Sequence, residues 1–175
     1  MDLGLRLISK QINEILWRTG RTLSIAESCT AGYVATVVTA TPGSSGFFRG
    51  GLVCYAEDTK IDLLDVDPNT IIEQTPACEE VAKQMVVGAN KLFRSNYAVA
   101  VTGFAGPGGG NETLRAGTIW LAVGNQDKTI TRKLTEDNGR SHNISEATRN
   151  VLEMLRDLLI ETEPNATILP TEQGE

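Results

Sequence analysis

Short apolar runs alternate along this chain with longer stretches of helical periodicity, and this alternation restricts the possible folds more than any other feature of the sequence. Runs typical of strands occupy residues 22–26, 51–55, 97–101, 117–123 and 129–134. Apolar residues at helical spacing predict helices over residues 2–19, 58–64, 78–93 and 144–159. Helices that alternate with strands, together with one hairpin between the last two strands, are typical of the α/β class. We therefore expect a single-domain α-β-α layered fold with a mixed sheet.

The segment 33–39 is the one place where intrinsic propensity and context disagree. Its valines and threonines favour a strand. The small residues Ala31, Gly32 and Ala35 would instead let a helix lie close against a sheet. We predict a helix here, before the proline- and glycine-containing loop at 41–45.

The length of the chain sets the expected number of domains. Its 175 residues correspond to one domain of ordinary size, and no linker or internal repeat divides them. We place this domain at residues 5–162. Residues 163–175 contain acidic side chains and no lysine or arginine, so we expect an acidic, mobile tail.

Charge and cysteine content exclude several classes of protein. Sixteen Lys and Arg against 22 Asp and Glu give a net charge of −6, which is not the basic footprint of a nucleic-acid-binding protein. The three cysteines are odd in number and widely spaced, with no CxxC or CxxH pair, which disfavours a disulfide scaffold and a zinc site. The long uncharged runs 28–48 and 95–111 contain proline, glycine and hydroxyl side chains, so neither can cross a membrane as one apolar helix. Charges at every fourth residue from Asp2 to Arg18 argue against a signal peptide, and we expect a cytoplasmic protein.

The segment 26–32, Ala-Glu-Ser-Cys-Thr-Ala-Gly, is the first of three that can carry chemistry. It lies where a predicted strand meets a predicted helix, so Ser28 stands beside the unpaired backbone N–H groups of the first helical turn. Such groups can hold an oxyanion or a phosphate. The structural alternative is that Ser28 or Thr30 simply caps the helix.

The segment 55–60 leaves another strand at the same presumed edge of the sheet. Lys60 could act as a base for a nearby serine if burial lowers its pKa from the usual value of about 10.4. A serine–lysine pair needs no histidine, and His142 is the only histidine in the chain. The structural alternatives are a solvated helix charge for Lys60 and a half-buried strand aromatic for Tyr55.

The segment 102–111 follows an apolar strand and contains five glycines between residues 103 and 110. Glycine allows close approach of the backbone, and successive N–H groups can bind an anion. The segment is not a P-loop, because no Gly-Lys-Ser/Thr follows, and its glycine spacing differs from that of a dinucleotide fingerprint. The structural alternative is a flexible surface loop.

Taken together, these segments resemble the CinA C-terminal domain family, whose members include the stand-alone nicotinamide-nucleotide amidases. The family pattern comprises Glu-Ser-Cys-Thr-Gly-Gly, Pro-Gly-Ser-Ser, Tyr-Ser-Asn-x-x-Lys, Thr-Gly-Ile-Ala-Gly-Pro-x-Gly-Gly and Gly-Thr-Val-Trp. The corresponding segments here are 27–32, 42–45, 55–60, 102–110 and 117–120. Order and spacing hold over nearly the whole chain.

The resemblance implies hydrolysis of nicotinamide mononucleotide to nicotinic acid mononucleotide and ammonia, with no metal or organic cofactor. It assigns the nucleophile to Ser28, the base or proton shuttle to Lys60 and an assisting function to Tyr55. The substrate-binding residues that we expect are Cys29, Thr30, Thr102, Gly103, Gly106, Gly108, Gly109 and Arg140. The resemblance also favours a homo-oligomer.

Two alternatives stay open at this point. Cys29 is a rival nucleophile, because a thiol is intrinsically more nucleophilic and a helix N-terminus would lower its pKa. The other alternative is a catalytically silent domain that binds a nucleotide or a partner. Residues 56–57, Ala-Glu, favour it because they replace Ser-Asn of the family pattern with a carboxylate near an anionic nucleotide. The presence of Ser28, Tyr55 and Lys60 favours the enzyme.

Overall fold

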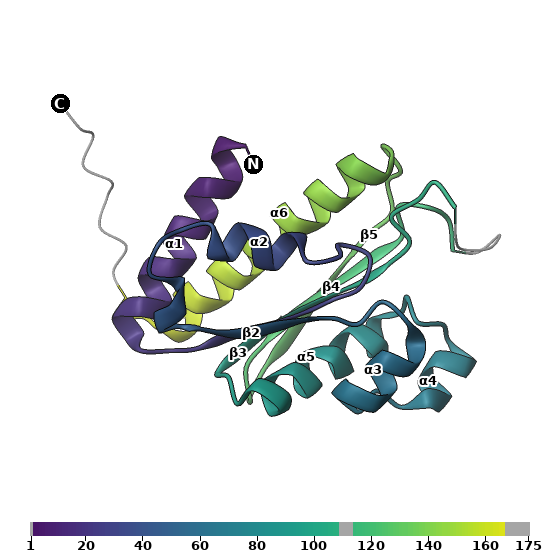
Figure 1. The fold of residues 1–175 in the computed structure, drawn as a ribbon, viewed down its shortest axis with the longest axis horizontal. Coiled ribbons are helices and arrows are strands. Elements are labelled where there is room, and N and C mark those ends of the chain that lie inside the picture. The colour runs from purple at the N-terminus through teal and green to yellow at the C-terminus, as the bar shows by residue number, and fades with distance from the viewer. Residues whose placement is uncertain (1, 109–113, 167–175) are drawn as a thin grey trace.

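The fold consists of a five-stranded sheet with helices on both faces (Figure 1). The computed structural model describes residues 2–108 and 114–166. The strands are β1 (Leu23–Glu27), β2 (Phe48–Val53), β3 (Tyr97–Gly103), β4 (Ile119–Gly124) and β5 (Thr129–Leu134). The helices are α1 (Leu3–Thr19), α2 (Tyr33–Thr39), α3 (Glu57–Leu64), α4 (Pro68–Glu73), α5 (Glu79–Phe93) and α6 (Arg140–Thr162), with a short 3-10 helix at Ser44–Gly46. This architecture confirms the predicted α-β-α layered fold.

The strand order β2-β1-β3-β4-β5 combines parallel and antiparallel pairs, as predicted for a mixed sheet. β1 lies between β2 and β3 and runs parallel to both. β4 is antiparallel to its neighbours β3 and β5. The carboxyl ends of β1, β2 and β3 therefore lie at one edge of the sheet, where ligands bind in many α/β folds. The segments that leave this edge begin at Ser28, Cys54 and Phe104. They belong to the three segments that the sequence analysis identified.

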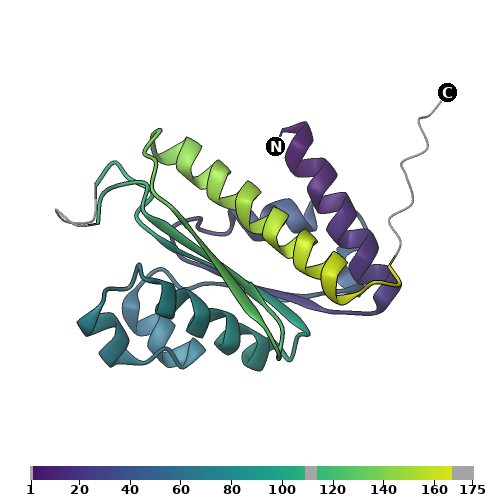
Figure 2. The ribbon, with the colours of Figure 1, turned by 180° about the vertical axis from the view of Figure 1, so that it is seen from behind.

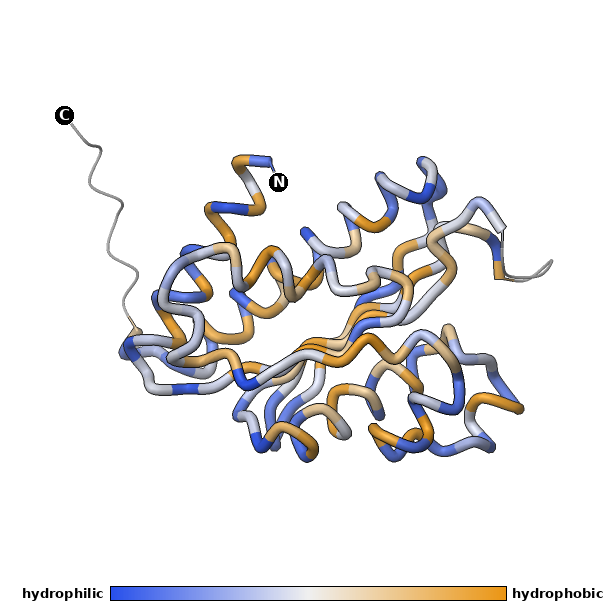
Figure 3. Tube along the Cα trace, viewed as in Figure 1, coloured by the Kyte–Doolittle hydropathy of each residue, from blue (hydrophilic) through white to orange (hydrophobic). Residues whose placement is uncertain are grey.

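Helices α1, α2 and α6 cover one face of the sheet, and α3, α4 and α5 cover the other (Figure 1, Figure 2). The sequence of β3 reflects this division, since Tyr97, Val99 and Val101 enter one core while Ala98 and Ala100 enter the other. The small alanines let α5 lie close to the sheet. Figure 3 shows that hydrophobic residues follow the central strands and the inner sides of the helices.

The contact between α3 and α5 orients the lysine of α3. Gly88 of α5 lies so close to α3 that a Cβ atom there would overlap the main chain of Leu64. Leu64 is buried and stands four residues after Lys60, so both side chains project from the same face of α3. The close packing of the two helices therefore turns Lys60 toward the sheet.

The N-terminal helix and the ambiguous segment both agree with the sequence prediction. Asp2 caps α1 by accepting a hydrogen bond from the Leu5 N–H at 3.0 Å, and Gly20, with a φ of 65°, ends the helix. The segment 33–39 forms α2, as context rather than propensity predicted.

The prediction differs from the structure at α4 and at β2. α4 is not among the helices predicted from the sequence, although Asp67 and Pro68 form a recognisable helix start. The Asp67 carboxylate accepts from the Asn69 N–H, and proline occupies the first helical position. β2 begins at Phe48, three residues before the predicted start. It ends at Val53, two residues before the predicted end. Gly50 conceals the start of the strand, because glycine is depleted in strands.

α6 has 23 residues and buries one side against α1 and the sheet. Its opposite side exposes charged residues such as Glu153 and Asp157, or leaves them half-buried. Among the described residues, no helix has the length and apolar character needed to span a bilayer.

Candidate active site

Ser28 and Lys60 meet at the carboxyl edge of the parallel strands. The Ser28 backbone N–H donates to Val101 O at 2.9 Å, so the turn after β1 stays attached to β3. The Nζ of Lys60 lies 3.2 Å from the Ser28 hydroxyl oxygen and donates to it. A hydroxyl in direct contact with a lysine amine is the arrangement that a serine–lysine mechanism requires.

Lys60 is almost completely buried, with 1% of its surface exposed. Its Nζ also donates to Cys54 O at 2.8 Å and Tyr55 O at 3.2 Å. Burial lowers the pKa of Lys60, because the ammonium form loses its hydration, and no carboxylate contacts its Nζ among the described residues. The alternative of a solvated helix charge is wrong. The amine of Lys60 therefore loses its proton more readily than that of a solvated lysine, and the neutral amine can accept a proton.

Cys29 differs from its neighbour in both exposure and ionisation. Its side chain is 4% exposed, and burial raises the pKa of the thiol to about 12. A thiol in this state supplies almost no thiolate at neutral pH. The environment of Cys29 therefore favours Ser28 as the nucleophile.

A cavity of about 270 Å³ joins the three segments. Eight of the predicted site residues line it, namely Ser28, Cys29, Tyr55, Lys60, Thr102, Gly103, Gly108 and Arg140. Thr30 and Gly106 lie beside the cavity without lining it, and Gly109 is outside the described residues. Four further lining residues were not predicted as site residues from the sequence: Pro76, Ala77, Phe104 and Ala105. Of these, Pro76 is held in place by the Thr102 hydroxyl, which donates to Pro76 O at 2.7 Å.

Arg140 and Tyr55 lie together at the exposed rim of this cavity. The Arg140 guanidinium donates to Gly106 O at 3.0 Å and to the Tyr55 hydroxyl at 3.4 Å. Tyr55 is 57% exposed and follows β2, so it is not the half-buried strand aromatic of the alternative interpretation. The two side chains place one positive charge and one hydroxyl where the polar end of a ligand would enter.

The N–H groups at the start of α2 are not free, contrary to the sequence prediction. α2 begins at Tyr33, and the Glu27 carboxylate accepts hydrogen bonds from Gly32, Val34 and Ala35. Neither Ser28 nor Thr30 caps the helix, so the capping alternative is also wrong.

The turn between β1 and α2 keeps two donors available near Ser28. Cys29 and Thr30 precede α2, and within the described part of the chain their backbone N–H groups donate to no other residue. The Thr30 hydroxyl is buried and also lacks a hydrogen-bond partner among those residues. Of the two residues, Cys29 also lines the cavity, and N–H groups at such a turn can stabilise an oxyanion.

No group of three or more His, Cys, Asp or Glu side chains within residues 2–108 and 114–166 is arranged to hold a metal ion.

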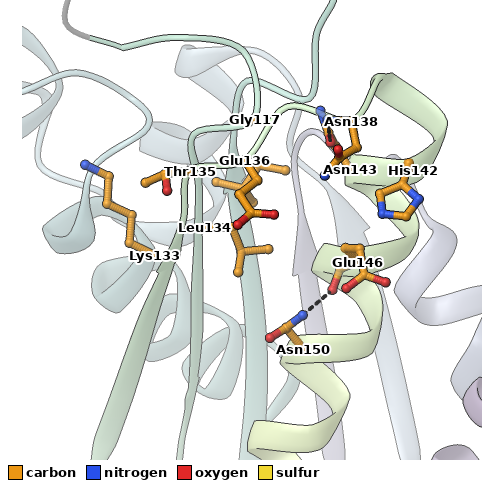
Figure 4. Close-up of a pocket in the computed structure, with 11 residues that line it drawn as sticks. Gly117, Lys133, Leu134, Thr135, Glu136, Asn138, His142, Asn143, Glu146 and Asn150 are labelled. Atoms are coloured by element: carbon orange, nitrogen blue, oxygen red, sulfur yellow. Dashed lines mark hydrogen bonds between the residues drawn. The ribbon is translucent and has the colours of Figure 1, made fainter.

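A second cavity, of about 250 Å³, lies between β5 and α6 (Figure 4). His142, Glu146 and Asn150 face it from α6, and Glu136 follows β5 on the other side. It contains neither Ser28 nor Lys60. Asn143 connects it with the first cavity, because its amide donates to Ala105 O at 3.0 Å. The contact between a buried lysine amine and a serine hydroxyl therefore makes the first cavity the candidate active site.

Comparison with known proteins gives a consistent result. Residues 6–159 match the family model of the CinA C-terminal domain. The nicotinamide-nucleotide amidohydrolase PncC of Escherichia coli strain K12 is 38% identical over 133 residues, which cover 75% of this chain and 81% of that protein. A CinA-like protein of Amoebophilus asiaticus is 36% identical over 152 residues, and the chain spans 36% of that protein's length. The crystal structure of the competence/damage inducible protein CihA from Agrobacterium tumefaciens superposes with a TM-score of 0.87 at 34% identity, covering 90% of this chain and 99% of that one.

Proposed function

The chain belongs to the CinA C-terminal domain family, and we propose that it hydrolyses the carboxamide of nicotinamide mononucleotide to give nicotinic acid mononucleotide and ammonia. The observation that carries this proposal is the contact of 3.2 Å between the buried Lys60 amine and the Ser28 hydroxyl in a cavity. The similarity to a nicotinamide-nucleotide amidohydrolase supports the substrate class.

Acylation begins when neutral Lys60 accepts the hydroxyl proton and the Ser28 oxygen forms a bond with the amide carbon. The carbonyl oxygen becomes an oxyanion, which the N–H groups of Cys29 and Thr30 stabilise. The carbon–nitrogen bond then breaks, and the proton on Lys60 moves to the leaving nitrogen, so that ammonia departs. The nicotinoyl group is left on Ser28 as an ester.

Deacylation uses the same residues in the same order. Lys60 accepts a proton from a water molecule, whose oxygen attacks the ester carbon. The bond to Ser28 breaks, and Lys60 returns the proton to the serine oxygen. No metal or organic cofactor takes part in this proposal.

The phosphate of the substrate would bind at the rim of the cavity. Arg140 supplies the positive charge there, and Gly103 and Gly108 line the adjacent wall. Glu57 also lines the cavity, and its carboxylate would repel a phosphate on that side. We therefore place the phosphate near Arg140 and the amide near Ser28.

Ammonia release tests the proposed function. Purified protein and nicotinamide mononucleotide should give ammonia and nicotinic acid mononucleotide in equal amounts, well above a heat-denatured control. The carboxylate of Glu57 at the cavity favours one alternative, a domain that binds nucleotides without hydrolysis. That alternative predicts no ammonia together with a rise in melting temperature on addition of the nucleotide.

Replacing Arg140 with alanine should raise KM by about tenfold to hundredfold, the range expected for a hydrogen bond to a charged group. The value of kcat should change little, because a phosphate contact is equally strong in the ground state and the transition state. Steady-state kinetics with nicotinamide mononucleotide measure both constants, and nicotinamide riboside, which lacks the phosphate, should be a poor substrate of the wild type.

The matched control is Arg156→Ala, on the same helix. Arg156 contacts its neighbour Asp157 and does not line the cavity, so both kinetic constants should stay at the wild-type values. Equal activity of the wild type on the riboside and the mononucleotide would contradict the assignment of Arg140 to the phosphate.

A further inference from the structure

Glu27 is a buried carboxylate directly before the nucleophile. It is the last residue of β1 and is paired with Val53 of β2 on one side and Val101 of β3 on the other. Its surface is 1% exposed, and it belongs to no ion pair within the described residues. A buried charge without a cation is unfavourable unless hydrogen bonds compensate it.

Backbone N–H groups provide that compensation. Oε2 of Glu27 accepts from Gly32 at 2.9 Å and from Val34 at 3.1 Å, while Oε1 accepts from Ala35 at 2.9 Å. A negative charge at a helix N-terminus is further stabilised by the helix dipole. The Glu27 carboxylate thus links the end of β1 to the first turn of α2 through hydrogen bonds.

The turn at residues 28–32, between β1 and the N–H groups that Glu27 binds, has little conformational freedom. Ala31 and Gly32 have φ values of 51° and 94°, which place two successive residues in the left-handed region. Alanine adopts this conformation only at an energetic cost, because its Cβ crowds the following carbonyl oxygen. The hydrogen bonds to Glu27 stabilise this strained geometry, and Ser28 lies between the carboxylate and the strained residues.

The backbone of Glu27 also connects to the base. Its carbonyl oxygen accepts from the Cys54 N–H at 2.8 Å, and Cys54 O accepts from the Lys60 amine at 2.8 Å. Lys60 in turn contacts Ser28, so that the four residues form a closed ring of contacts. Ser28 and Lys60 are therefore both held in position through contacts of Glu27.

We propose that Glu27 is a positioning residue of the active site: its carboxylate, by accepting the N–H groups at the start of α2, fixes the turn that aims the Ser28 hydroxyl at Lys60 and leaves the Cys29 and Thr30 N–H groups directed to the oxyanion. This inference rests on the proposed amidase function. It assigns Glu27 no contact with the substrate.

The Glu27→Gln variant tests this assignment with the smallest change in shape. The amide can still accept hydrogen bonds through its oxygen, but its NH₂ group faces a backbone N–H in place of one carboxylate oxygen. We expect kcat per folded molecule to fall by about tenfold to hundredfold, as for other small displacements of reacting groups, with KM within about threefold of wild type. The pH at which activity rises should not move, because Glu27 does not touch the Lys60 amine.

A second variant, Gly32→Ala, weakens the hydrogen bond between the residue 32 N–H and the Glu27 carboxylate while Glu27 itself is unchanged. A Cβ at Gly32 would lie 3.7 Å from Cγ2 of Val53, an ordinary van der Waals distance, so the substitution acts mainly through the unfavourable φ of 94°. A fall in kcat at constant KM is expected here too. This variant decides the question if Glu27→Gln does not fold.

The matched control is Asp2→Asn, which changes a capping carboxylate of α1 to an amide far from the cavity. It should lower the melting temperature without changing kcat per folded molecule. If Glu27→Gln and Gly32→Ala behave like this control, Glu27 merely caps α2 and the inference is wrong. An inactive wild type would refute the proposed function instead, so the two failures are distinguishable.

Discussion

The Ser28→Ala variant is expected to release ammonia from nicotinamide mononucleotide roughly four to six orders of magnitude more slowly than the wild type. Ser28 carries the hydroxyl that Lys60 contacts in the cavity, and alanine offers no atom that can form the acyl bond. The loss should fall on kcat, because the walls of the cavity stay intact. Ammonia release at saturating substrate measures it, and stabilisation of the variant by the nucleotide should persist in a thermal shift experiment.

Cys29→Ala is the matched control for this prediction. Its thiol is buried and has a pKa of about 12, so the thiolate that would attack an amide is scarce. The Cys29 backbone N–H, our candidate oxyanion donor, does not depend on the side chain. The variant should therefore keep a substantial fraction of wild-type turnover. Loss of activity in Cys29→Ala together with retention in Ser28→Ala would assign the nucleophile to the thiol.

Periodicity and glycine placement predict most of the fold. Short-range patterns are sufficient for α1, because its charged stripe, its capping Asp2 and its terminal Gly20 all lie in adjacent sequence. At 33–39 propensity alone would predict a strand, and only the packing requirement of the small residues around it favours the helix. The start of β2 escapes prediction because Gly50 pairs with Ser24 of β1 through its backbone, to which a propensity scale is insensitive.

The sequence predicts most residues of the candidate site, but it does not predict how their side chains contact one another. The sequence indicates which segments share an edge of the sheet, and the structure brings Ser28 and Lys60 into contact there. The burial of Lys60 depends on the close approach of α5 at Gly88, and no local pattern in α3 encodes that approach. The same holds for Glu27: nothing in its neighbourhood along the chain reveals that a strand carboxylate occupies the start of α2 and removes those donors from the active site.

Some expectations from the sequence stay predictions. The domain limits at 5–162, the cytoplasmic location and the homo-oligomer belong to this group. Gly109 and residues 167–175 of the predicted tail 163–175 lie outside the described residues. Within the described part of that tail, Glu163 pairs with Arg21 and accepts a hydrogen bond from Tyr97.

Lys60→Ala should lower kcat almost as far as Ser28→Ala, to within about tenfold of that variant, because the serine hydroxyl is a weak nucleophile without a base. Lys60→Met, which keeps the aliphatic volume in the buried position, should show the same loss and so separates lost basicity from lost packing. Ammonia release measures both variants. Lys91→Ala is the control, since Lys91 is exposed, pairs with Asp65 and should be replaceable without loss of activity.

The pH dependence of the wild type follows from the direction of the Lys60 pKa shift. Only the neutral amine can accept the serine proton, and burial lowers the pKa, which extends the neutral form to lower pH. The value of kcat/KM should therefore rise as the pH rises through this lowered pKa and level off above it. The residual rate of Lys60→Ala should lack this rise. A wild-type profile that falls with increasing pH over the same range would contradict the assignment of Lys60 as the base.

The double variant Ser28→Ala/Lys60→Ala should be little worse than either single variant. Lys60 lowers the activation barrier only by taking a proton from the Ser28 hydroxyl, so its contribution disappears once that hydroxyl is absent. The coupling energy from a double-mutant cycle should then be nearly as large as each single loss. If the two losses multiplied instead, serine and lysine would act in separate steps, and their contact of 3.2 Å would reflect packing of a buried lysine rather than proton transfer.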